Sequence, residues 1–187
     1  MTISRGTGHH AQAKSASCRI PFPSIGFRRY NTWVVLSIKA RRYMAENRSA
    51  RPAQDQFGRQ AAFYAESVTF RHGESLDAVA EFAALGRYAR VVDLGTGPGF
   101  TAFIMAPYSQ HVLATDIAPG MLVQARRLMA GRRLDNVGLM LAEAESLPFT
   151  PDSLDAVTSR QAAHHFHALP RAVAEVWRVL KPGAPLY

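Results

Sequence analysis

The fold is decided by the stretch Arg90-Val91-Val92-Asp93-Leu94-Gly95-Thr96-Gly97-Pro98-Gly99-Phe100. A β-branched run ends in an acid, and three glycines at alternate positions lead into the apolar residues 101–104. This order predicts a strand, a tight turn and a helix. Glycine permits positive φ and a close approach of backbone to ligand, and a helix N-terminus offers unpaired N–H donors. The stretch therefore predicts a site for a polar or anionic small molecule at the carboxyl end of a strand.

The spacing of the glycines separates two kinds of cofactor site. The usual dinucleotide fingerprint is G-x-G-x-x-G, whereas here Gly95, Gly97 and Gly99 alternate and Phe100 stands where the third glycine would be. The run Val-Asp-Leu-Gly-Thr-Gly-Pro-Gly closely resembles the first motif of the class I S-adenosylmethionine-dependent methyltransferases. Asp93 is part of that resemblance. A carboxylate at this position suits a cationic sulfonium ligand and would repel the anionic pyrophosphate of a dinucleotide. A plain tight turn is the structural alternative.

The second landmark is Asp116, which ends a predicted strand over residues 111–115. An acid about 20 residues past the glycines can accept hydrogen bonds from ribose hydroxyls, and Asp is also a good cap for the next helix. The two roles are compatible. Upstream, residues 56–64 predict a helix with Phe57, Ala61 and Tyr64 on one stripe. The resemblance makes this a segment that covers cofactor and substrate, while a plain packing helix is the alternative.

Two further landmarks follow predicted strands over residues 137–142 and 153–159. Glu143-Ala144 and the Leu-Pro-Phe run at 147–149 resemble the family segment that cradles adenine, although the family usually has Asp where this chain has Glu143. The resemblance places residues 160–167 at the mouth of the site, where histidines could orient the substrate or take a proton. His164 and His167 at i, i+3 could also pair on a metal, but no third ligand supports that.

These landmarks give the predicted site. The resemblance implies S-adenosyl-L-methionine as cofactor, a small-molecule methyl acceptor, and in-line displacement in which the protein mainly aligns the reactants. No metal is expected. The predicted cofactor-binding residues are Asp93, Gly95, Thr96, Gly97, Gly99, Asp116, Ile117, Glu143, Ala144 and Arg160, and the predicted acceptor-side catalytic residues are Arg160, His164 and His165.

The composition bounds where such a protein works. The chain has 187 residues, a net charge of +8 and one cysteine, Cys18. A single cysteine excludes an internal disulfide framework, so a cytoplasmic setting is expected. No apolar run approaches the ~18 residues of a membrane span. Residues 1–43 hold eight Lys or Arg and no acid, and the rest is formally neutral, so the charge is no argument for nucleic acid as substrate.

The basic segment 1–43 has three interpretations. It could be a disordered arm that touches RNA or lipid, an organelle transit peptide, or an extension upstream of a natural start at Met44, which is the favoured interpretation. The predicted domains are accordingly a disordered basic leader over residues 1–43 and a methyltransferase domain over residues 44–187.

The C-terminal part predicts one more helix and the start of a strand. Leu169, Val173, Val176, Trp177 and Leu180 form an apolar stripe that we expect to be buried, and residues 184–187 begin a fifth strand.

The implied fold is α/β, a doubly wound Rossmann-like sheet. It is incomplete, because the family sheet has seven strands and this chain predicts four to five parallel ones. We therefore expect a C-terminally truncated methyltransferase of the type 11, quinone-biosynthesis-like kind. A non-catalytic remnant and a nicotinamide-dependent oxidoreductase are the alternatives.

Overall fold

The computed structural model describes residues 51–187, so the predicted leader over 1–43 and the start at Met44 lie outside the described residues. The elements in chain order are α2 (Arg51–Glu66), α3 (Val68–Arg71), α4 (Glu74–Ala84), β1 (Tyr88–Leu94), α5 (Phe100–Met105), η1 (Ala106–Tyr108), β2 (Ser109–Asp116), α6 (Pro119–Met129), β3 (Val137–Leu141), β4 (Ala156–Thr158), η2 (Ala163–His165) and α7 (Leu169–Val179).

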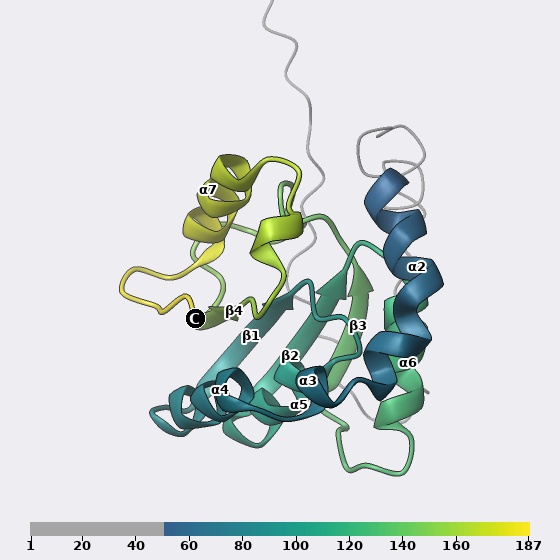
Figure 1. Ribbon diagram of the computed structural model, residues 1–187. Coiled ribbons are helices and arrows are strands. Elements are labelled where there is room, and N and C mark those ends of the chain that lie inside the picture. Colours follow the sequence, from purple (N-terminus) through teal and green to yellow (C-terminus); the bar gives the residue numbers. More distant parts are fainter. Residues whose placement is uncertain (1–50) are drawn as a thin grey trace, which may run out of the picture.

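The strands form one parallel sheet in the order β3-β2-β1-β4 (Figure 1). Val91 of β1 is in register with Val112 of β2 on one side and with Ala156 of β4 on the other. The predicted fifth strand begins beside β4, where Tyr187 N donates to Val157 O at 2.9 Å and the pairing is again parallel. The α/β, Rossmann-like prediction is confirmed.

Successive residues of the strands face opposite sides of the sheet, as the pleat requires. Val91 packs into a core with α4, α5 and α6, while Val92 packs into a second core with α7. Helices therefore cover both faces, which explains why the central strands are apolar runs rather than alternating ones. Pro107 ends α5 and places a short 3₁₀ turn before β2.

The predicted buried stripe of α7 is wrong for three of its five members. The helix buries Val176 and Leu180 as expected, but Ala172 and Val179 complete the buried face. The other three predicted residues are exposed, at 46% for Leu169, 51% for Val173 and 82% for Trp177. The sequence carries two apolar stripes at helical spacing, and the second sheet core accepts the one with the smaller side chains.

Helix α2 lies against the start of α6 (Figure 1). A Cβ added at Gly120 would lie 3.0 Å from the carbonyl oxygen of Gly58, so the two backbones approach closely at this point. Ala61, Ala118 and Met121 form a small buried cluster beside them. Within residues 51–187 no helix has both the length and the apolar character needed to cross a membrane.

Candidate functional site

The three glycines after β1 all have positive φ, at 64°, 54° and 96° for Gly95, Gly97 and Gly99. Their surroundings differ. A Cβ at Gly95 would lie 2.5 Å from the Cβ of Ala162, and one at Gly99 would lie 2.6 Å from the ring of Phe103. A Cβ at Gly97 would meet nothing within 4 Å. Of the three glycines, only Gly97 has open space at the position where a side chain would begin.

Asp116 ends β2 beside this turn. Its Oδ2 accepts a hydrogen bond from Gly97 N at 2.9 Å, and its Oδ1 accepts one from Ala118 N at 2.8 Å. Burial raises the pKa of Asp116 to about 6, and these backbone hydrogen bonds partly oppose the rise. The bond goes to the N–H of Ala118, which is itself the N-cap residue of α6, and the helix has no side-chain cap hydrogen bond, so the alternative in which Asp116 caps α6 is wrong. Its carboxylate instead joins the turn after β1 to the end of β2.

Asp93 is buried below the turn. Thr96 Oγ1 donates to one of its oxygens at 2.6 Å, and Thr158 Oγ1 of β4 donates to the other at 2.8 Å. Burial raises the pKa of Asp93 to about 6, against the two threonine hydrogen bonds and the positive charge of Arg160. Asp93 therefore ties the glycine turn to β4, and its contact with a cofactor stays a prediction.

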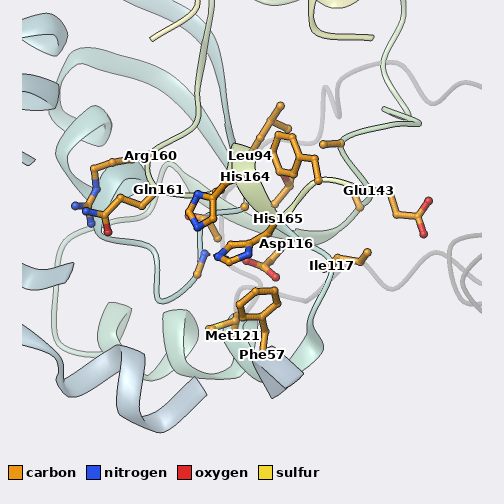
Figure 2. A pocket seen from close by; sticks show the side chains of 18 of the residues that line it. Phe57, Leu94, Asp116, Ile117, Met121, Glu143, Arg160, Gln161, His164 and His165 are labelled. Atoms are coloured by element: carbon orange, nitrogen blue, oxygen red, sulfur yellow. Dashed lines mark hydrogen bonds between the residues drawn. The ribbon is translucent and has the colours of Figure 1, made fainter. Parts of the chain in front are cut away.

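A cavity of about 670 Å³ lies at the carboxyl ends of the strands (Figure 2). Its volume is typical of a small-molecule site. Ten of the predicted site residues line it, and Asp93 and Gly99 do not. The ten are Gly95, Thr96, Gly97, Asp116, Ile117, Glu143, Ala144, Arg160, His164 and His165.

Glu143 and the histidines lie on different sides of this cavity. Figure 2 shows the Glu143 carboxylate pointing away from His164 and His165. The two imidazole rings are 3.8 Å apart between centroids, and the ring of Phe57 meets His165 edge-on at 4.7 Å. Burial lowers the pKa of His165, and the neighbouring His164 lowers it further. The adenine role of Glu143 and the acceptor roles of the histidines stay predictions.

Three aromatic side chains from the segment before β1 form one side of the cavity, here called the aromatic wall: Phe57, Tyr64 and Phe70. Phe57 and Tyr64 meet edge-on at 6.2 Å, and Tyr64 lies 4.6 Å from Phe70. The first two were predicted as a covering stripe. The sequence gives no such signal for Phe70, because this residue lies on the separate helix α3, whose four residues are too few for a periodic pattern.

Arg160 lies at the edge of the cavity and its guanidinium points away from the histidines (Figure 2). Its Nε donates to Thr101 Oγ1 at 3.3 Å, and its two terminal nitrogens donate to Ser75 Oγ at 3.0 Å and to Phe70 O at 2.9 Å. The next residue, Gln161, also lines the cavity with a φ of 54°, a strained value for a non-glycine residue that no sequence pattern predicts. Contact of Arg160 with cofactor or acceptor stays a prediction.

The loop that carries the adenine landmark is held by α7. Arg178 donates to the carbonyl oxygens of Leu147 and Phe149 at 3.0 and 2.8 Å and pairs with Glu175 at 2.6 Å. Glu175 in turn accepts a hydrogen bond from Leu147 N at 2.8 Å. No group of three or more His, Cys, Asp or Glu in the described part of the chain is placed to hold a metal ion.

Comparison with known proteins gives a consistent result. Residues 92–187 match the family described as "Methyltransferase domain". The uncharacterized methyltransferase YcgJ of Bacillus subtilis is 38% identical over 125 residues, which are 67% of this chain and 49% of that protein. A demethylmenaquinone methyltransferase of Clavibacter sepedonicus is 39% identical over 50% of this chain and 38% of its own length.

Solved structures agree. The crystal structure of YcgJ superimposes with a TM-score of 0.56 over 59% of this chain and 47% of that one, at 40% identity. Phosphoethanolamine N-methyltransferase 2 of Haemonchus contortus, solved in complex with S-adenosyl-L-methionine, gives 0.54 over 60% of this chain and 26% of that one, at 26% identity. The chain spans about half or less of the length of each of these relatives. The match over residues 92–187, with the fold and glycine turn described above, shows that the chain belongs to the methyltransferase domain family.

Proposed function

We propose that the chain binds S-adenosyl-L-methionine at the carboxyl ends of β1 and β2 and transfers its methyl group to a small-molecule acceptor. The observation that carries the proposal is at Gly97. Its missing side chain faces open space, while its N–H donates to Asp116 at the end of the neighbouring strand. A ligand in the cavity could meet the turn backbone and a carboxylate at one place, which is how α/β sheets hold nucleoside cofactors.

The residues present fit this cofactor. The turn at Gly95 and Gly97 would receive the methionine part, Asp116 the ribose hydroxyls, and Glu143 with Ala144 the adenine. A carboxylate has about four lone-pair sites, and the backbone N–H groups of Gly97, Ala118 and Ile117 hydrogen-bond to Asp116. The carboxylate therefore keeps acceptor capacity for ribose.

The chemistry asks for alignment rather than for a protein nucleophile. When bound, S-adenosyl-L-methionine supplies a methyl group on a positively charged sulfur, ready for displacement by an incoming atom. The cavity would hold the two reactants in line, and the carboxylates of Asp93 and Asp116 would favour a cationic ligand. The aromatic wall would keep water from the reacting atoms.

The acceptor would lie beside the aromatic wall and the histidines, which contact each other through Phe57 and His165. An apolar body would pack against Phe57 and Tyr64. His165 would be neutral near pH 7, because its pKa is lowered by burial and by His164. A neutral imidazole can take a proton from an acceptor that must lose one.

Titration calorimetry with S-adenosyl-L-methionine on the full chain tests the cofactor half. We expect saturable binding that Asp116→Ala weakens by about 30-fold or more, since one or two charge-assisted hydrogen bonds are lost. Asp135→Ala is the matched control, because Asp135 is exposed and away from the cavity, and it should leave the affinity unchanged. Absence of heat from the folded full chain, or equal affinity in the Asp116→Ala variant, would contradict the proposal. Tighter binding of a nicotinamide dinucleotide would favour an oxidoreductase.

The acceptor half has its own test. His165→Ala should bind S-adenosyl-L-methionine within about threefold of the unmodified chain, because the histidine is assigned to the other side of the cavity. Loss of cofactor affinity by tenfold or more in this variant would move His165 to the cofactor side.

A further inference from the structure

Arg160 and His165 belong to one loop, residues 160–165, that follows β4, and this loop contacts the aromatic wall at both of its ends. At one end the ring of His165 packs on Phe57, with centroids 4.7 Å apart. At the other end Arg160 donates a hydrogen bond to the carbonyl oxygen of Phe70 and lies 6.0 Å from the ring of the same residue. Between the two contacts, Tyr64 joins Phe57 to Phe70.

The hydrogen bond to Phe70 O fills a specific need. Helix α3 has only four residues, and the last carbonyls of any helix lack intrahelical donors. Arg160 supplies a charged donor to one of them. The same guanidinium reaches Ser75 at the start of α4 and Thr101 in α5, so it holds the end of the aromatic wall to the helices that cover the sheet.

We propose that Arg160 is a positioning residue that fixes the aromatic wall over the site through Phe70, instead of contacting the cofactor or the reacting atoms. Each of its three guanidinium nitrogens donates to a protein oxygen, and the group points away from the histidine pair (Figure 2). This proposal rests on the proposed function in one respect only, which is the identity of the ligand that the aromatic wall covers.

A fluorescent reporter in the wall tests this without any ligand. Phe70→Trp is combined with Trp33→Phe and Trp177→Phe, which remove the two native tryptophans. The tryptophan introduced at position 70 is then titrated with acrylamide. We expect Arg160→Ala to raise its quenching constant by about twofold or more, since the wall opens locally when its anchor is lost. Arg160→Lys should give an intermediate value, because a lysine keeps the charge and one point of donation but not the fork.

Arg71→Ala is the matched control. It removes the same charge from the residue after Phe70 on the same helix, at an exposed position, and it should leave the quenching unchanged. Circular dichroism and thermal unfolding confirm that each variant is folded. If Arg160→Ala does not fold, Arg160→Lys and Ser75→Ala carry the comparison, and both should raise the quenching above that of the Arg71→Ala control.

The result that overturns the proposal is a folded Arg160 variant whose quenching equals that of the parent. If such a variant also lost S-adenosyl-L-methionine affinity by tenfold or more, Arg160 would contact the ligand directly. Because the quenching is measured on the ligand-free chain, failure of cofactor binding would leave its outcome unaffected, and the two proposals fail separately.

Discussion

Replacing the first two glycines of the turn by alanine, one at a time, should separate stability from binding. Both have positive φ, and an alanine there costs about 1–2 kcal/mol in backbone strain. At Gly97 nothing else is added, because its Cβ would meet no atom within 4 Å. At Gly95 the Cβ would overlap that of Ala162 at 2.5 Å, and such overpacking adds about 1–3 kcal/mol. Gly95→Ala should therefore lower the free energy of unfolding by about 2–5 kcal/mol and Gly97→Ala by about 1–2 kcal/mol.

Binding should show the reverse order. A methyl group at position 97 occupies the space assigned to the cofactor, so the affinity of folded Gly97→Ala for S-adenosyl-L-methionine should fall by about tenfold or more, which is about 1.4 kcal/mol. Urea unfolding gives the first quantity and titration calorimetry the second. The double variant Gly95→Ala with Ala162→Gly should recover the overpacking part of the loss.

The reasoning would be refuted by either of two results. Equal stability of the two single variants, with no recovery in the double variant, would mean that residue 95 does not face Ala162. Unchanged affinity in Gly97→Ala would mean that the open space beside this glycine is not where the cofactor lies.

Three further predictions concern the carboxylates and α7. Burial raises the pKa of Asp93 and Asp116 to about 6, so each binds a proton more tightly in the folded chain than in the unfolded one. As the pH rises from about 4 to about 6, their contribution should lower the free energy of unfolding of the ligand-free protein by at most about 1 kcal/mol per pH unit for each group, with no further loss above that range. Urea unfolding of Asp116→Asn should show a weaker dependence of this free energy on pH. An unchanged pH dependence would contradict the raised pKa of Asp116. Arg178→Ala should lower the free energy of unfolding in urea by about 2 kcal/mol, because two carbonyl oxygens and Glu175 each lose a donor. A decrease below about 0.5 kcal/mol would show that other contacts hold the loop at residues 147–149. Trp177→Ala should change stability by less than about 0.5 kcal/mol while Val176→Ala costs about 1–2 kcal/mol, because the tryptophan is 82% exposed and the valine is buried; the opposite order would restore the predicted stripe.

The sheet could be predicted because its signals are local. The residues of β1 and β3 are apolar runs of the right length between turn residues, and the glycines mark where β1 ends. The face of α7 could not be predicted in the same way. Both of its stripes fit a helix, and the choice depends on which one packs against the second sheet core, whose members Phe149 and Leu154 come from other parts of the chain.

The candidate site could likewise be predicted only where its signals are local in the sequence. Asp116 and the glycines could be found because their spacing along the chain is itself the signal. The different surroundings of Gly95 and Gly97 could not, since they depend on Ala162, which lies far along the chain. The partners of Arg160 are 59, 85 and 90 residues away, and the Thr158 partner of Asp93 is 65 residues away. Such pairs exist only once the sheet has brought its strand ends together.

The close approach of α2 to α6 fixes the helix that carries Phe57 and Tyr64, two residues that line the cavity. The two helices can pack this closely only because residue 120 has no side chain, since any side chain there would press on the carbonyl oxygen of Gly58. Gly120→Ala would push α2 outward and carry Phe57 and Tyr64 with it. A Cβ at Gly58 would meet nothing within 4 Å, so Gly58→Ala would leave the spacing unchanged. One methyl group at a residue that does not line the cavity would therefore shift, by a few tenths of an ångström, two aromatic rings that do line it.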